Sequence, residues 1–143
     1  MAGYSATPLP EKLGIRAHSR VAVISAPSTY PAALGELPEG VDVRTDARGR
    51  LDVVVFFVTR RAELARRFPA MARAIRQDGG LWIAWPKKAS NVITDLSEAY
   101  TREVGLGAGL VDNKVCAIDD TWSGLRFVYR VVDRTASRVA ARR

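Results

Sequence analysis

The sequence has almost no cysteine or histidine, and this lack excludes several kinds of site. Cys116 is the only cysteine and His18 is the only histidine. One thiol cannot form an internal disulfide or a multi-cysteine metal site. We expect no serine triad, because His18 is the only histidine available to Ser25 or Ser90. The two residues lie at opposite ends of the chain in different kinds of segment. We therefore interpret Cys116 as a buried strand residue and His18 as a solvated loop residue, and we predict no metal site.

Long apolar runs are also missing. The longest one, Val53 to Val58, is far shorter than the roughly 20 residues of a membrane span. The first residues, Met1 to Ser5, show neither a basic region followed by an apolar stretch nor a small-residue cleavage site. We expect no membrane association, and together with the single cysteine this favours a cytoplasmic location.

Acidic residues are too few to balance the basic ones, and the net charge is +7. Arg138, Arg142 and Arg143 lie in the last nine residues, which contain no acid. Much of the remaining positive charge is arginine on one predicted helix, where it alternates with apolar positions as a solvated face does. No aromatic residues are interleaved with it, as a stacking platform for single strands would require. We do not expect nucleic acid as a partner.

Apolar residues, by contrast, are abundant enough for a core, at 48% of the chain. The length of 143 residues is close to the common domain size of roughly 100–150 residues. We predict one domain over residues 1–134, followed by a basic, disordered tail over residues 135–143.

Strands and helices alternate along the predicted domain. Leu51–Val58 and Leu81–Trp85 are apolar on both faces, as central strands of a parallel sheet are. The last two strands are joined by the short loop Asp119–Gly124, which only antiparallel neighbours permit. The predicted strands are Arg20–Ser25, Val41–Arg44, Leu51–Val58, Leu81–Trp85, Val111–Ile118 and Leu125–Val132, and the predicted helices are Thr29–Leu37, Thr59–Gln77 and Asp95–Val104.

Caps and breakers set the predicted helix boundaries. Thr59 and Thr94 are predicted N-caps, each followed by a glutamate in the first turn. Pro69 is expected to kink or restart the first of these helices. Asp78–Gly80 is expected to end that helix, and the glycines at 105, 107 and 109 to end the next one.

This order of elements predicts a three-layer, Rossmann-like α/β fold. Its mostly parallel sheet of about six strands closes with an antiparallel C-terminal hairpin. The stretch Leu51 to Arg130 resembles the end of a class I methyltransferase. In such proteins Asp-Gly-Gly, here at residues 78–80, is the usual entry to the strand before the last helix.

Several short motifs also resemble a bacterial family of unknown function, number 3052. The segments that carry this resemblance are Met1–Ser5, Lys12–Ile15, Trp85–Ser90, Asp112–Cys116 and Thr121–Leu125. The resemblance extends to about Arg134. It implies a small, stand-alone intracellular protein, and the family has no established activity that could be transferred to this chain.

A glycine-rich turn after the first strand, which lets the backbone approach a cofactor, is absent. The first strand runs into Ser25–Ser28, where side chains occupy that space and Pro27 removes a backbone donor. The Gly-x-Gly-x-Gly at residues 105–109 follows a helix, the reverse of the order that a phosphate cradle needs. We predict no cofactor and no catalytic residue, and we interpret Asp46, after the second strand, as a turn residue.

Ligands of open α/β sheets bind outside the carboxyl ends of the strands. Lys87 and Lys88 follow a central strand there and could bind a phosphate or carboxylate. They could equally be solvated loop residues, and the neighbouring tryptophans could be core or lid residues. The candidate ligand-binding residues are Ser25, Ser28, Thr59, Trp85, Lys87, Lys88, Asp120 and Trp122.

Three functions remain open from the sequence. The favoured hypothesis is a non-catalytic, Rossmann-like binding or regulatory module whose partner is another protein or a second copy of the chain. The first alternative is a binder of a small anionic or nucleotide-like ligand. The second alternative is a diverged S-adenosylmethionine-dependent methyltransferase.

Overall fold

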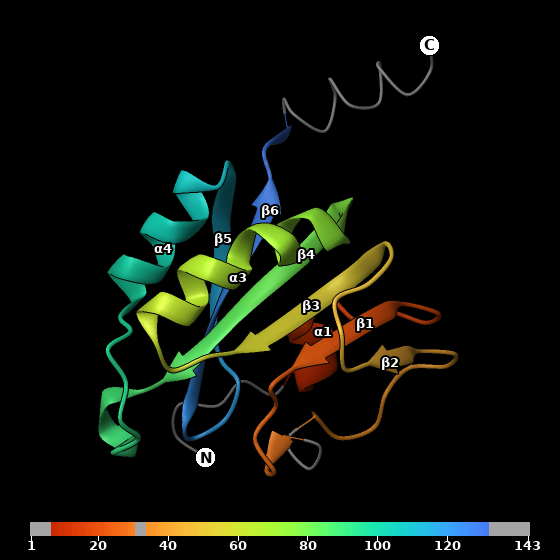
Figure 1. Ribbon diagram of the computed structural model, residues 1–143. Helices are drawn as coiled ribbons and strands as arrows, with labels where there is room; N and C mark the ends of the chain where they lie inside the picture. The colour runs from red at the N-terminus through yellow and green to blue at the C-terminus, as the bar shows by residue number, and fades with distance from the viewer. Residues whose placement is uncertain (1–6, 31–33, 132–143) are drawn as a thin grey trace.

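A computed structural model describes residues 7–30 and 34–131. They form a six-stranded sheet in the order β2-β1-β3-β4-β6-β5 (Figure 1). Its strands are β1 (Arg20–Ile24), β2 (Asp42–Arg44), β3 (Leu51–Phe57), β4 (Ile75–Pro86), β5 (Leu110–Ala117) and β6 (Trp122–Tyr129). The helices are α1 (Leu9–Leu13), α3 (Arg61–Ala74), α4 (Glu98–Gly107) and the 3₁₀ helix η1 (Lys88–Ser90).

The sheet is parallel on one side and antiparallel on the other. β2, β1, β3 and β4 run parallel, β6 runs antiparallel to β4, and β5 runs antiparallel to β6. The predicted fold class, with its closing antiparallel hairpin, is confirmed. The carboxyl ends of β1, β3 and β4 lie at one edge, here called the carboxyl edge, and their starts lie at the opposite amino edge.

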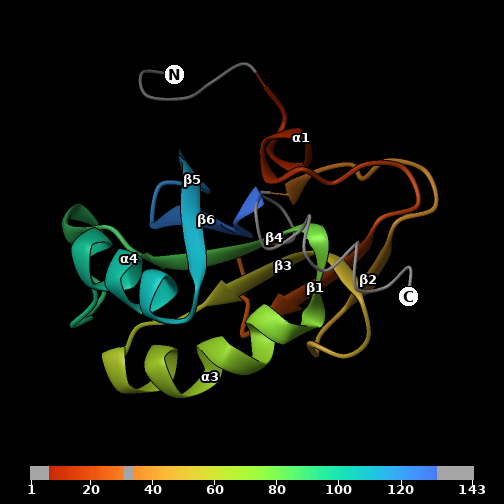
Figure 2. The same ribbon diagram turned by 90° about the horizontal axis from the view of Figure 1, so that it is seen from above.

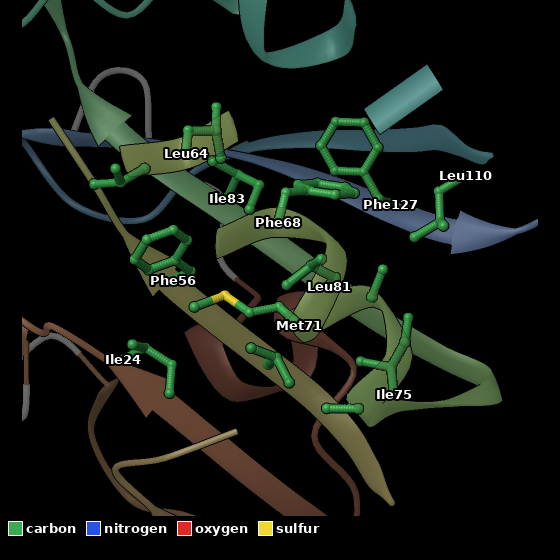
Figure 3. Close-up of a cluster of buried hydrophobic side chains, with 14 of the residues drawn as sticks. Ile24, Phe56, Leu64, Phe68, Met71, Ile75, Leu81, Ile83, Leu110 and Phe127 are labelled. Atoms are coloured by element: carbon green, nitrogen blue, oxygen red, sulfur yellow. The ribbon is translucent and has the colours of Figure 1, made fainter. Parts of the chain in front are cut away.

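The two faces of the sheet are covered by different elements. Figure 2 shows α3 and α4 on one face and α1 on the other. Successive side chains of a strand point to opposite faces, so Phe56 packs on the α3 face and Phe57 on the α1 face. Figure 3 shows the apolar cluster of the α3 face, in which the rings of Phe68 and Phe127 meet edge-on with centroids 5.3 Å apart.

The helix α3 ends earlier than predicted. It stops at Ala74, with Pro69 inside it, and the expected continuation to Gln77 is wrong. Ile75 is already extended and pairs with Leu51 in the sheet. Gly79, predicted to end the helix, instead lies in β4, where an added Cβ would come within 2.8 Å of the Asp52 carbonyl oxygen. Gly79 therefore lets β3 and β4 approach closely next to the shift in their register between Leu51 and Val53.

The helix α4 begins and ends later than predicted. Ser97, not Thr94, caps it, because the Ser97 hydroxyl accepts a hydrogen bond from the Tyr100 N–H at 3.2 Å. Gly105 lies inside the helix, whereas Gly107 is its last residue, with Ala108 as the C-cap. Gly109 follows with a φ of 92°, which a glycine adopts without strain.

Other differences are smaller. The predicted loop Asp119–Gly124 is shorter in the structure, because β6 begins at Trp122, which pairs with Pro86 of β4. Residues 31–33 of the predicted helix Thr29–Leu37 lie outside the described residues. The predicted tail, residues 135–143, lies outside them as well. Within the described residues, no helix combines the length and the apolar character needed to cross a membrane.

Candidate functional site

The turn after β1 stands at the switch point of the sheet. β1 lies between β2 and β3, and the chain leaves β1 toward one side of the sheet and β3 toward the other. Such a crevice is where open α/β sheets bind ligands. Ser25 has a φ of 58° there, a left-handed backbone that favours glycine, and its side chain is exposed, as is that of Ser28. A residue other than glycine thus takes the conformation for which many nucleotide-binding turns use glycine.

A buried tyrosine, Tyr30, follows this turn in the chain. Tyr30 is only 3% exposed, and within the described part of the chain its hydroxyl has no hydrogen-bond partner. Its ring meets Phe57 edge-on at 4.9 Å, and Phe57 meets Trp122 in the same way at 5.1 Å. Burial raises the pKa of the Tyr30 hydroxyl above its ordinary value. Trp122, a predicted site residue, is therefore a buried member of the α1 face.

The end of β3 is held by the loop that precedes α4. The Thr59 carbonyl accepts hydrogen bonds from the Thr94 hydroxyl at 2.7 Å and from the Asp95 N–H at 3.4 Å. The Asp95 carboxylate accepts one from the Arg61 N–H at 2.7 Å. The predicted capping of α3 by the Thr59 side chain is wrong, because Arg60 occupies the N-cap and Asp95 supplies the carboxylate from a distant loop.

A cavity of about 700 Å³ opens beside the end of β4. Lys87 is half-buried and Lys88 is exposed, and Trp85 forms part of the wall while only 6% exposed. The remaining lining residues come from the following loop, the start of α4 and β6: Pro86, Asn91, Val92, Ile93, Thr94, Leu96, Ser97, Glu98 and Ser123.

The lysine loop has a defined shape. The Lys87 N–H donates to the Thr121 carbonyl at 2.8 Å, and the Ser90 hydroxyl donates to the Lys87 carbonyl at 2.6 Å. Asn91 ends η1 with a φ of 64°, a conformation that asparagine tolerates better than most residues. These bonds fix the backbone from which both lysines extend.

The structure divides the predicted site residues into two groups. Trp85, Lys87 and Lys88 line one cavity together. The other five, Ser25, Ser28, Thr59, Asp120 and Trp122, are absent from its lining. Next to Asp120, the Asp119 carboxylate accepts hydrogen bonds at 2.8 Å from the backbone of Thr121 and of Trp122, which is turn chemistry.

Sequence reasoning missed Ser97 and Ser123 as lining residues. Ser123 pairs with Trp85 across β4 and β6, a register that only the assembled sheet reveals. Ser97 followed by Glu98 is itself a signal for the start of a helix. Thr94, three residues earlier, gives the same signal and is the N-cap that the sequence predicts instead.

The only cysteine and the only histidine, Cys116 and His18, lie in different parts of the fold. Cys116, on β5, is half-buried rather than buried. Burial raises the pKa of its thiol, while the charges of Lys12 and Lys114 oppose that rise. His18 is exposed in the loop before β1. Among the described residues, no group of three histidine, cysteine or acidic side chains could hold a metal ion.

Known proteins resemble this chain in fold. No family model matches it and no curated sequence matches it significantly, so the resemblance to family 3052 is not confirmed. Precorrin-6y C5,15-methyltransferase from Geobacter metallireducens GS-15 aligns with a TM-score of 0.59 and 10% identity, over 85% of this chain and 86% of its own. For the TehB-like SAM-dependent methyltransferase from Corynebacterium glutamicum ATCC 13032 the values are 0.57, 11%, 90% and 91%.

A third similar structure contains a ligand. Magnesium protoporphyrin IX methyltransferase from Synechocystis PCC 6803, with bound SAH, aligns with a TM-score of 0.54 and 12% identity, over 78% of this chain and 74% of its own. The chain therefore has a methyltransferase-like, Rossmann-type fold.

The turn after β1 does not fit S-adenosylmethionine in the way a glycine-rich turn would. Ser25, Ala26 and Pro27 carry side chains where backbone would approach the cofactor, and Pro27 has no N–H to donate. Asp46, after β2, forms an exposed ion pair with Arg48 at 3.4 Å. An acid after the second strand can hold a cofactor's ribose, and Asp46 is such an acid, but the glycine-rich turn after β1 is absent.

Proposed function

We propose that this chain is a binding protein for a small anionic ligand, carrying a phosphate or a carboxylate, held in the cavity beside Lys87. The observation that supports the proposal is the cavity itself, since small-molecule sites commonly measure roughly 300–1,000 Å³. It lies at the carboxyl edge, where this class of sheet binds its ligands. The comparisons do not bear on this cavity; they favour the diverged methyltransferase, considered below, over the regulatory module that the sequence favoured.

The charges of the cavity suit an anion. Lys87 and Lys88 contribute two ammonium groups, and α4 begins at the cavity wall with the positive end of its dipole. Glu98 is the acid of the lining, and its carboxylate is bound by the Arg102 guanidinium at 2.8 Å. The hydroxyls of Ser97 and Ser123 supply neutral hydrogen-bonding groups, and Trp85 supplies an apolar wall.

S-adenosylmethionine-dependent methyl transfer is the second candidate. The similarity in fold to the methyltransferases above favours it. The residues after β1 weigh against it, as described. The two candidates differ in place, because the first depends on Lys87 and the second on the turn at Ser25.

Thermal denaturation of the full chain with inorganic phosphate, AMP, ATP, S-adenosylmethionine and SAH tests both candidates. A compound at 100 times its dissociation constant adds about 2.7 kcal/mol, which for a chain of this length raises Tm by on the order of 10 °C. We expect a phosphate-bearing compound to raise Tm in the wild type and the rise to be lost in Lys87→Ala. Lys114→Ala, which removes an exposed lysine outside the cavity, is the matched control and should keep the full rise.

Two results would contradict the first candidate. One is that no phosphate- or carboxylate-bearing compound changes the Tm of the wild type. The other is that S-adenosylmethionine or SAH alone raises Tm and Lys87→Ala keeps the rise, which would favour the methyltransferase candidate.

A further inference from the structure

A second cavity, of about 510 Å³, opens at the amino edge of the sheet, opposite the lysine loop. Its lining residues lie at or next to the starts of β3 and β4 and the ends of α3 and β6. Figure 1 shows these element ends on one side of the molecule. Three of its seven lining residues are arginines, and the set is Arg50, Arg73, Ile75, Arg76, Gln77, Asp78 and Tyr129. Segments distant in the sequence thus place their arginines around one hollow.

Two of the three arginines in this cavity have no ion pair among the described residues. Arg76 pairs with Asp52 at 3.4 Å. In the described ranges, neither Arg50 nor Arg73 has an ion-pair partner. Asp78 is the one acid of the lining, so the three arginines, Asp78 and the Asp52 that pairs with Arg76 together carry one net positive charge.

The walls of this cavity are held by hydrogen bonds. The Tyr129 hydroxyl donates to the Ala72 carbonyl at 2.6 Å, which ties the end of β6 to the end of α3. Asp52, which holds Arg76, also accepts a hydrogen bond from the Arg20 N–H at 2.7 Å. The Arg73 charge lies close enough to Tyr129 to oppose the rise in its pKa that burial causes.

The sequence continues the positive charge from the same place. The described chain ends at Val131, directly after β6 and the exposed Arg130. The residues that follow include Arg134, Arg138, Arg142 and Arg143 against the single acid Asp133. Tyr129 of the arginine cavity is therefore followed along the chain by a basic stretch of the sequence.

We propose that the amino edge binds nucleic acid through its phosphate backbone, with Arg50, Arg73 and Arg76 holding a phosphate in the cavity. Guanidinium groups bind phosphate oxygens through paired N–H donors, and such contacts carry no sequence preference. The Tyr129 ring is half-buried and its hydroxyl is engaged, so the surface binds backbone rather than stacked bases. The sequence did not predict this partner because Arg73 and Arg76 lie on a predicted helix whose arginines are interpreted as a solvated face, and Arg50 joins them only in the fold.

The test measures binding of the full chain to a labelled DNA duplex of about 20 base pairs and to a single-stranded RNA, over a range of salt concentrations. We expect affinity to fall steeply with salt and to be similar for unrelated sequences. The double variant Arg50→Gln/Arg73→Gln should weaken binding by about tenfold or more and reduce the slope of log K against log salt by about two. Asp78→Asn removes the one acid of the lining and should strengthen binding.

The matched control is Arg44→Gln/Arg60→Gln, which removes the same charge from exposed residues outside both cavities. It should change affinity and slope much less than the amino-edge pair. Equal losses in the two double variants would overturn the proposal, because net charge alone would then explain binding. Binding of ATP or pyrophosphate without binding of either nucleic acid would also overturn it.

Discussion

The two faces of the sheet are covered in different ways. The α3 face is covered by two regular helices, α3 and α4, of 14 and 10 residues. The α1 face is covered by a five-residue helix, α1, by the helical residues Tyr30 and Leu34, and by the loop residue Ile15. The polar groups differ as well. Thr101, buried in α4, donates to the Ser97 carbonyl at 2.8 Å, whereas the buried Tyr30 hydroxyl has no partner in the described ranges.

This difference indicates where the molecule is rigid and where it can adjust. Regular helices pack a continuous apolar stripe against the sheet, and a gap left there cannot close without moving a whole helix. A short helix and loops can shift locally to fill a gap. We therefore expect the α1 face to relax more than the α3 face when side chains are removed.

Phe56 and Phe57 offer a direct test of this comparison, since they are neighbours in β3, are both buried, and point to opposite faces. Phenylalanine-to-alanine changes in cores cost about 3–5 kcal/mol, with the smaller costs at sites that collapse. We expect Phe56→Ala to lower the free energy of unfolding by an amount near the top of that range and Phe57→Ala by one near the bottom. Urea denaturation of both variants measures the difference, and an equal or larger loss for Phe57→Ala would break the comparison.

Gly105 tests how tightly the α3 face is packed. A methyl group on Gly105 would overlap the ring of Phe127, whereas one on Gly107, two residues later, would meet nothing within 4 Å. Overpacking of this kind costs about 1–3 kcal/mol, so Gly105→Ala should destabilise the protein. Gly107→Ala, its control, should stabilise it by up to about 1 kcal/mol because alanine favours the helix. A stabilising Gly105→Ala would show that the α3 face has room to spare.

The α3 face is also the one that sequence patterns predict best. The spacing of Leu64, Phe68, Met71 and Ile75, at three and four residues, predicts one apolar helix stripe; all four are buried, but Ile75 lies in β4 and not in α3. The boundaries failed where contacts distant in the sequence decide them. Ile75 leaves the helix to pair with Leu51, and Asp95 replaces Thr59 as the capping group of α3. A window of neighbouring residues contains no information about either contact.

For the candidate sites, the sequence indicated which charged residues could bind a ligand, but not which of them lie together in the fold. Lys87 and Lys88 follow an obvious central strand, so their place at the carboxyl edge could be predicted. The arginine cavity could not, because Arg50, Arg73 and Arg76 come from a loop, a helix end and a strand start. Their meeting depends on the register of β3 against β4, which no local pattern sets.

Tyr30→Phe gives the smallest expected effect and tests the α1 face alone. A buried hydroxyl without a partner costs the folded state free energy, so removing it should stabilise the protein by about 1 kcal/mol or leave it unchanged. The variant should also respond differently to pH. Burial raises the Tyr30 pKa in the folded protein above the value of about 10 that an unfolded tyrosine has. Above that pH the unfolded chain loses the proton while the folded chain keeps it, so stability falls as pH rises.

Tyr30→Phe should therefore lose less stability than the wild type between pH 9 and pH 11, which urea denaturation at several pH values measures. Tyr129 is present in both proteins, so its own titration cancels in the difference. A destabilising Tyr30→Phe would mean that the hydroxyl has a partner after all. Parallel pH profiles would mean that the ring reaches solvent before the protein unfolds. Either result would remove the contrast between a fully satisfied α3 face and an α1 face that tolerates an unpaired polar group.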